Sequence, residues 1–306
     1  MHRSTRFRTL LLREWMQHRT GWLVLMALPT LLMLGLGVFD SAAVQVGSVD
    51  TGDLSTLPPV LQALLWTIAT VALALLLVGL TVLAQLPGLA RRDQQDRSIE
   101  FWRSLPVGHV QGIGATVLMH LLVLPAAALL AGLLGAQLVV LVSMVVHQSL
   151  LTWLQLPWGQ LLPSLGLAAA RLLLGLLLAV LWLSPLLLLT MAASAWLRRW
   201  AVPVVSAASL VGVYWLDARL PVPLVGPAFR RIGTEALSAL LAPDLFDGPH
   251  RLAQADLAGA TAGLPMALLQ DADRVLASAA SPAFGLALAG GALGFSLLVW
   301  RRQRAV

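Results

Sequence analysis

Cysteine and lysine are both absent from this chain of 306 residues, and each absence excludes a class of chemistry. Without cysteine there is no disulfide, no thiolate nucleophile and no metal site with sulfur ligands. A phosphate-binding loop of the GxxxxGK(S/T) type needs its lysine to contact the β- and γ-phosphates of a nucleotide. All 20 basic residues are arginine, so this chain does not supply an ATP site of that kind.

Charge of either sign is also scarce, and long apolar runs take its place. Charged residues make up 11% of the chain and hydrophobic residues 58%, with a mean hydropathy of +0.84. A soluble domain carries roughly 25% charged residues. Several runs reach the roughly 20 residues that a helix needs to cross a bilayer, and helices satisfy their own backbone in lipid. The sequence predicts an all-α integral membrane protein, with residues 1–306 as a single transmembrane domain.

Six transmembrane helices are expected, and the arginines between them indicate their orientation. The predicted spans are residues 21–39, 61–86, 111–136, 166–196, 201–218 and 281–300. Arginines gather in residues 1–20, in residues 87–110, at 198–199 and in residues 301–304, and these clusters hold 14 of the 20. Cytoplasmic loops are rich in basic residues, and all four clusters share one side if two spans separate each pair. Both termini are then cytoplasmic, and residues 219–280 are extracytoplasmic.

The preference of basic residues for the cytoplasmic side also indicates how many spans the long apolar stretch 112–147 contains. Two spans there would place Arg198, Arg199 and the C-terminus outside the cell. One span followed by an outer loop or interfacial piece is therefore predicted. Within the extracytoplasmic segment, helical apolar spacing predicts short helices at residues 231–241 and 264–276.

The first 20 residues are basic and amphipathic, and we expect no signal cleavage. The apolar run that follows them is longer than the 7–15 residues of a signal core. Phe7, Leu10, Leu11 and Trp15 share one helical face, so this stretch is expected to lie along the membrane as an anchor or docking element, an elbow helix. Its candidate residues are Phe7, Leu11, Arg13, Glu14 and Trp15.

Residues 87–110 form a charged island between two membrane-length runs. The island holds four arginines and three acids. Its helical part ends before Pro106, because the residue preceding a proline avoids the helical region. It is an ordinary cytoplasmic loop in one interpretation. In the other, which we favour, residues 96–104 form a short helix that contacts a soluble partner. The contact residues are then Arg97, Ser98, Glu100, Phe101, Trp102 and Arg103.

The end of the island carries a sequence pattern that resembles one found in a known protein family. Glu100 is followed by Ser-Leu-Pro-Val at residues 104–107, and the third span begins shortly after, near His109. Together with the amphipathic N-terminal stretch and the extended segment before the last span, this layout resembles the permease subunit of a type-2 ABC exporter. The resemblance implies that residues 96–105 are a coupling helix seated on a separate ATP-binding cassette ATPase subunit. Residues 6–18 would be the elbow helix beside it.

The resemblance also implies the remaining partners and the location. It predicts a second permease half, identical or related, in a bacterial cytoplasmic (inner) membrane, with no nucleic acid bound. The chain itself is then not an enzyme and binds no cofactor, because ATP and Mg²⁺ belong to the ATPase subunit. His120 and Arg171 are ionisable residues inside spans and are candidates for the substrate path. A path lined by apolar side chains suits an amphipathic or hydrophobic cargo, such as a drug, a peptide or a lipid-like molecule.

Two alternatives come from other classes of protein. Asp93 and Asp96 lie one helical turn apart, and membrane prenyltransferases use aspartates at such spacing to hold Mg²⁺ on a diphosphate. The other acidic candidate, Asp271 with Asp273, is expected on the opposite side of the membrane, which weakens that hypothesis. The second alternative is a membrane scaffold that transports nothing.

Small residues recur four positions apart in two of the predicted spans. They are Ala128 with Gly132, Ala131 with Gly135, Gly285 with Ala289, and Gly290 with Gly294. Small side chains let helix backbones approach closely. We expect these positions to pack helices against one another within the subunit.

Overall fold

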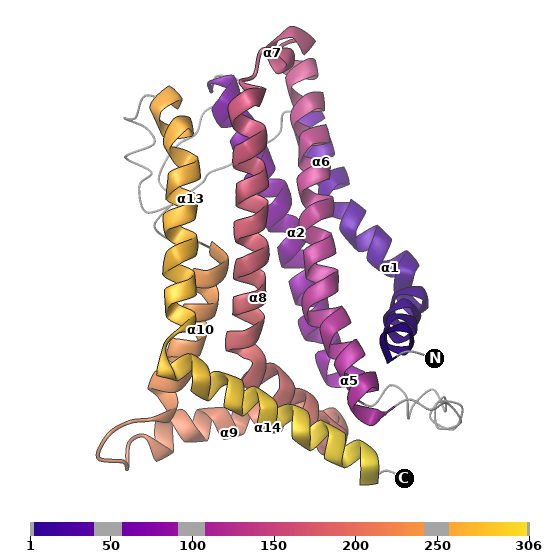
Figure 1. Cartoon of the computed structure of the whole chain (residues 1–306), viewed down its shortest axis with the longest axis vertical. Helices are drawn as coiled ribbons and strands as arrows, with labels where there is room; N and C mark the ends of the chain where they lie inside the picture. The colour runs from indigo at the N-terminus through magenta and orange to yellow at the C-terminus, as the bar shows by residue number, and fades with distance from the viewer. Residues whose placement is uncertain (1–2, 40–56, 91–107, 242–256, 305–306) are drawn as a thin grey trace.

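The computed structural model describes residues 3–39, 57–90, 108–241 and 257–304, and all regular structure in these ranges is helical. Long helices stand side by side, and α9 and α14 lie across the lower end of the molecule (Figure 1). The predicted all-α class is therefore confirmed for the described residues.

Three long helices form the first half of the fold. They are α1 (Arg3–Phe39), α2 (Pro59–Leu89) and a continuous helical run made of α5 (His109–Leu118), the π-helical turn η2 (Met119–Val123) and α6 (Leu124–His147). Pro125 explains the π-helical turn, because it has no N–H to donate to the carbonyl four residues earlier. Helix is continuous across residues 112–147, whereas a span that ends at residue 136 and is followed by an outer loop or interfacial piece was predicted.

The second half is built around α8 (Trp158–Leu197), which follows the short α7 (Leu150–Leu154). The chain turns at η3 (Arg198–Trp200) into α9 (Ala201–Val211) and the π-helical η4 (Gly212–Leu216). Arg198 has a φ of 54° and a ψ of −123°, a backbone conformation that residues other than glycine rarely adopt. The remaining helices are α10 (Val225–Leu241), α13 (Leu257–Ala279) and α14 (Pro282–Arg304).

Five stretches of the described chain are long and apolar enough to cross a membrane. They are Phe7–Val38, Pro59–Leu89, His109–His147, Trp158–Leu216 and Pro282–Arg304. These stretches suggest a transmembrane protein. The count of six is not confirmed, because the predicted spans at 166–196 and 201–218 fall within one of the five, which η3 interrupts.

A separate elbow helix is not confirmed, because residues 6–18 are the first part of α1, which continues into the first apolar stretch without a break. Leu10 is buried, and Leu11 and Trp15 pack against the core that α1 shares with α2, α5 and α8. Phe7 and Arg13 are half-buried, whereas Glu14 is buried. The apolar face expected from the spacing therefore contacts other helices of this chain.

Glycines allow close approach between helices in both halves. A β-carbon on Gly132 would lie 3.1 Å from the Ala74 side chain of α2, and one on Gly135 would collide with Thr30 of α1. On α14, a β-carbon on Gly294 would lie 2.9 Å from backbone atoms of Leu188 and Leu189 in α8. Gly290 of α14 makes a similar contact, where a β-carbon would lie 2.9 Å from the Pro185 side chain of α8. Four of the predicted glycines thus pack helices within the subunit, while Gly285 has open space around it.

Helix ends that carry basic residues meet at one end of the fold. The indole rings of Trp196 and Trp300 are 6.1 Å apart and join the ends of α8 and α14. The guanidinium of Arg302 lies against Gly112, where a β-carbon would approach it to 3.1 Å. Thr116, one turn further along α5, donates to a carboxylate oxygen of Glu14 at 3.3 Å. The basic clusters in residues 1–20, 198–199 and 301–304 therefore lie at the same end of the fold.

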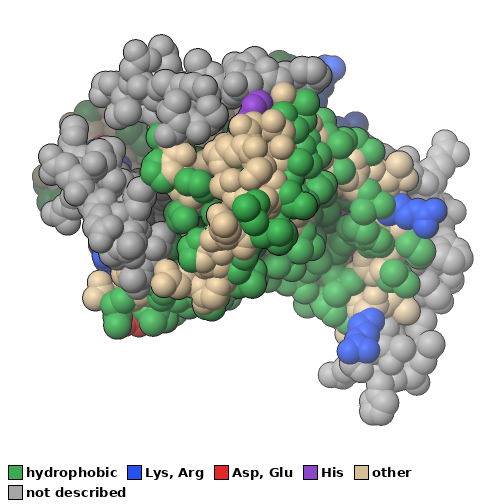
Figure 2. All heavy atoms as spheres, turned by 90° about the horizontal axis from the view of Figure 1, so that it is seen from above, with side chains coloured by type: hydrophobic (Ala, Val, Ile, Leu, Met, Phe, Trp, Pro, Cys, Tyr) green, Lys and Arg blue, Asp and Glu red, His purple; other side chains and the backbone are tan. Residues whose placement is uncertain are grey.

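Much of the outer surface is apolar. Leucines such as Leu134 and Leu286 are each 76% exposed. The described surface seen from above is mainly hydrophobic, with the few charged side chains toward its margin (Figure 2). Lipid is a favourable neighbour for such a surface, since it costs nothing to leave leucine in contact with acyl chains.

Candidate functional site

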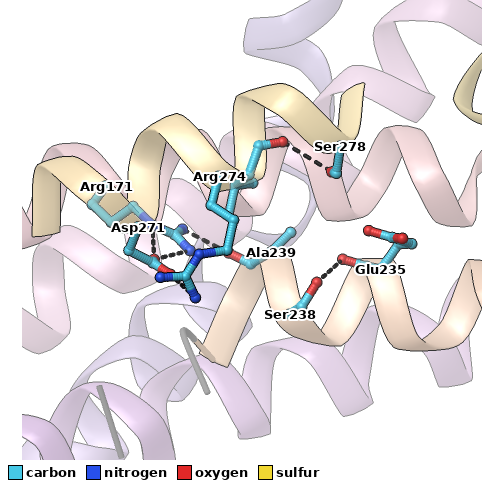
Figure 3. Close-up of polar contacts among 8 residues, drawn as sticks. Arg171, Glu235, Ser238, Ala239, Asp271, Arg274 and Ser278 are labelled. Atoms are coloured by element: carbon cyan, nitrogen blue, oxygen red, sulfur yellow. Dashed lines mark hydrogen bonds and ion pairs between the residues drawn. The ribbon is translucent and has the colours of Figure 1, made fainter. Parts of the chain in front are cut away.

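The most distinctive polar site in the described chain is a buried charge pair between α8 and α13. Arg171 of α8 is 4% exposed and Asp271 of α13 is 2% exposed. Their side chains point toward each other between the two helices (Figure 3). Two opposite charges taken out of solvent stabilise each other strongly, because the effective dielectric constant around them is low.

Two nitrogen atoms of Arg171 form hydrogen bonds at this site, and the third lies close to the carboxylate. Nε donates to Oδ2 of Asp271 at 2.5 Å, and Nη2 lies 2.5 Å from the same oxygen. Nη1 donates to the backbone carbonyl of Ala239 in α10 at 2.7 Å. One guanidinium thereby joins α8, α10 and α13.

The packing at this point depends on Gly175, one turn along α8 from Arg171. A β-carbon there would lie 2.1 Å from the Ala239 carbonyl oxygen and 2.5 Å from Nη1 of Arg171. The absence of a side chain therefore allows α10 to approach α8 and the hydrogen bond to form. Arg274 adds a weaker contact from the exposed side, with Nη1 3.9 Å from Oδ1 of Asp271.

An apolar cluster joins the three helices of the charge pair to α14. Trp182 and Phe284 stack edge to face with centroids 5.1 Å apart. Ala236 and Ala239 of α10 and Val275 of α13 pack into the same cluster. The helices predicted at 231–241 and 264–276 thus both exist, and both are longer than predicted and pack along α8.

This geometry bears on two of the sequence predictions. Arg171 is bonded to protein groups in the described structure, so a role in contacting cargo would require the charge pair to open. Asp271 is the carboxylate that bonds it, while Asp273 is exposed on the same helix. Among the described residues no group of three or more histidines or acids could hold a metal ion.

His120 lies at a helix contact. It is 1% exposed in η2, and its Nδ1 donates to the Thr116 carbonyl at 3.0 Å. Its ring meets the Trp22 ring of α1 edge-on, with centroids 5.9 Å apart. Close by, the buried Glu14 contacts the neighbouring Arg13 and accepts from Thr116. A second polar site therefore connects α1 with α5 and η2.

The residues predicted to contact an ATPase lie outside the described ranges. Arg97, Ser98, Glu100, Phe101, Trp102 and Arg103 all fall in 91–107, as do Asp93 and Asp96. The helices that flank this segment, α2 and α5, are described up to Leu89 and from His109.

Asp217 forms a capping site at the start of α10. Its Oδ1 accepts from the backbone N–H groups of Leu224 at 2.9 Å and Val225 at 2.8 Å, and its Oδ2 from that of Gly226 at 2.6 Å. Partial burial raises the pKa of this carboxyl, whereas the three N–H groups together lower it by more. The pKa of Asp217 consequently lies below its ordinary value of 3.8.

This lowered pKa predicts a pH-dependent effect of Asp217→Asn. The stabilisation by the carboxylate is complete above its ordinary pKa and is lost as the pH falls through the lowered, folded-state value. Amide exchange at Leu224, Val225 and Gly226 should be faster in the variant than in the wild type above about pH 4, and the difference should vanish in stronger acid. Hydrogen exchange followed by mass spectrometry from neutral pH downward measures this. A difference that stays constant with pH would contradict the capping role.

Comparisons of the chain with protein-family models, with curated proteins and with solved structures gave no match.

Proposed function

We propose that this chain is the permease subunit of an ATP-binding cassette exporter. In this proposal it has six spans with both termini in the cytoplasm, and it pairs with a second permease half. A separate ATPase subunit binds ATP and Mg²⁺, because this chain has no lysine for a phosphate-binding loop. The cargo is amphipathic or hydrophobic, in keeping with the scarcity of charge along the apolar helices.

The charged island at residues 87–110 carries the proposal. It lies between two stretches long and apolar enough to cross a membrane, Pro59–Leu89 and His109–His147. Its pattern of Glu100 followed by Ser-Leu-Pro-Val at residues 104–107 resembles the coupling loop of type-2 exporter permeases. Additional support comes from the contacts that bring the helix ends near Glu14, Arg302 and Trp196 together. Basic clusters on one face of a membrane protein are typical of its cytoplasmic side.

The coupling role is tested by co-purification with a candidate ATP-binding cassette ATPase subunit. Glu100→Arg and Phe101→Ala should each weaken the complex, because truncation of a central contact costs about 2 kcal/mol, or roughly 30-fold in affinity. The matched control is Glu235→Arg, the same charge reversal placed on α10. If Glu100→Arg and Phe101→Ala retain the ATPase as well as this control does, the coupling assignment is wrong.

A further inference from the structure

An exposed apolar stripe runs along α14 and ends in a tryptophan and an arginine. Leu286, Leu293 and Trp300 follow one another at intervals of seven residues, and Arg304 comes one turn later, so these residues share one face of the helix. Leu286, Leu293 and Trp300 are 76%, 57% and 43% exposed. The buried residues of α14 lie on another face, which packs against α8. The stripe is therefore open to whatever surrounds the protein.

The end of this stripe meets the end of α8, which runs beside α14 in the lower part of the molecule (Figure 1). Trp196 of α8 is 40% exposed, and its ring lies 6.1 Å from the Trp300 ring. The guanidinium of Arg304 lies over the Trp300 ring, 4.0 Å from its centroid. Arg301 is three residues before Arg304, so the two arginines are neighbours on the helix surface. We call Trp196, Trp300, Arg301 and Arg304 the arginine–tryptophan surface.

The two arginines of this surface have no acidic partner in the described part of the chain. Neither Arg301 nor Arg304 forms an ion pair with a described carboxylate. Nε of Arg301 is buried and forms no hydrogen bond with any described residue. Guanidinium groups bind phosphate oxygens with two parallel hydrogen bonds. The surface therefore offers two cationic groups that suit a phosphate.

The neighbouring side chains indicate what kind of molecule carries that phosphate. Tryptophan next to arginine is typical of the headgroup level of a bilayer. The leucines of the α14 stripe favour acyl chains over water, because exposed leucine costs nothing in lipid. A soluble anion would occupy the arginines and leave the stripe in water. A phospholipid with an anionic headgroup matches the arginines, the indole rings and the stripe together.

We propose that the arginine–tryptophan surface binds the headgroup of an anionic phospholipid. Arg301 and Arg304 contact the phosphate, Trp196 and Trp300 lie at the boundary with the acyl chains, and the chains follow the leucine stripe of α14. Because the two indoles belong to α8 and α14, the bound lipid contacts the ends of both helices. The proposal is independent of what the protein transports.

The absence of cysteine allows a direct test with one label on the full-length chain. Gln303→Cys, labelled with bimane, places a fluorophore at an exposed position of α14 next to Arg304. The labelled protein, in neutral detergent micelles, is titrated with dioctanoyl phosphatidylglycerol. The emission should shift and saturate, and dioctanoyl phosphatidylcholine should have little effect. Arg301→Gln with Arg304→Gln should raise the apparent Kd roughly 25-fold, or roughly 5-fold for each arginine.

The matched control is Arg230→Gln with Arg231→Gln, two exposed arginines on α10, which should leave the apparent Kd unchanged. Equal thermal melting curves for the two double variants exclude a folding effect. The proposal is overturned if inorganic phosphate reproduces the shift, which would indicate a free-anion site, or if polyglutamate does, which would indicate an acidic protein partner. It is also overturned if the shift follows protein concentration without lipid, which would indicate a second copy of the chain, or if it survives loss of both arginines.

Discussion

Asp271→Leu is expected to lower the free energy of unfolding by about 3–5 kcal/mol, the cost of leaving a buried charge without its partner. The substitution keeps an apolar side chain on the buried face of α13 but leaves the Arg171 guanidinium with the Ala239 carbonyl alone. Arg171→Met combined with Asp271→Leu should recover most of the loss, because replacing a whole buried pair with apolar groups is often close to neutral.

Thermal and denaturant unfolding in a fixed detergent measure this series. Asp273→Leu is the matched control, since it removes an exposed carboxylate two residues along the same helix. The control should change the free energy of unfolding by less than about 0.5 kcal/mol. If Asp271→Leu is no more destabilising than Asp273→Leu, the charge pair does not hold α13 to α8.

Gly175→Ala is expected to destabilise the fold by about 3 kcal/mol, at the upper end of the usual cost of overpacking. The added methyl group would meet the backbone oxygen of Ala239, which cannot move without displacing α10, as well as the Arg171 guanidinium. Gly166→Ala, in the same helix, has nothing within 4 Å of the added atom. It should be neutral or stabilising by up to about 1 kcal/mol, because alanine favours helix more than glycine does.

The same denaturation assay compares the two alanine variants. A second measurement separates local from global effects: hydrogen exchange should rise in α10 for Gly175→Ala and stay unchanged for Gly166→Ala. Equal stability of the two variants would mean that the close approach of α10 to α8 at Ala239 is not required.

Much of the fold follows from the amount and length of apolar sequence. A helix is the element that satisfies its own backbone in lipid, so the runs around residues 61–86 and 111–136 could only be predicted as helices. The ends of these helices were less predictable, because contacts with neighbouring segments determine where an apolar helix ends. The helix predicted to end at residue 136 runs on to His147, where Nε2 of that histidine donates to the Gly37 carbonyl of α1 at 2.7 Å.

The charge pair was only half predictable. Arg171 stands out as the one arginine inside an apolar run, and such a residue needs a partner. Its partner lies 100 positions away in sequence. One signal for it was present: Asp271 shares a helical face with Leu268 and Val275, so it had to be buried if that face packed. Spacing alone could not indicate which helix would receive that face, because that depends on packing between distant segments.

The measurement that tests the central claim most directly is ATP turnover by the partner ATPase subunits reconstituted with this chain in lipid nanodiscs. The proposal predicts that the wild-type chain forms a complex whose ATP hydrolysis responds to an amphipathic cargo, and that Phe101→Ala loses this response while Glu235→Arg keeps it. ATP hydrolysis that is the same with and without this chain would contradict the proposal. So would turnover of a prenyl diphosphate with Mg²⁺ by the purified chain alone.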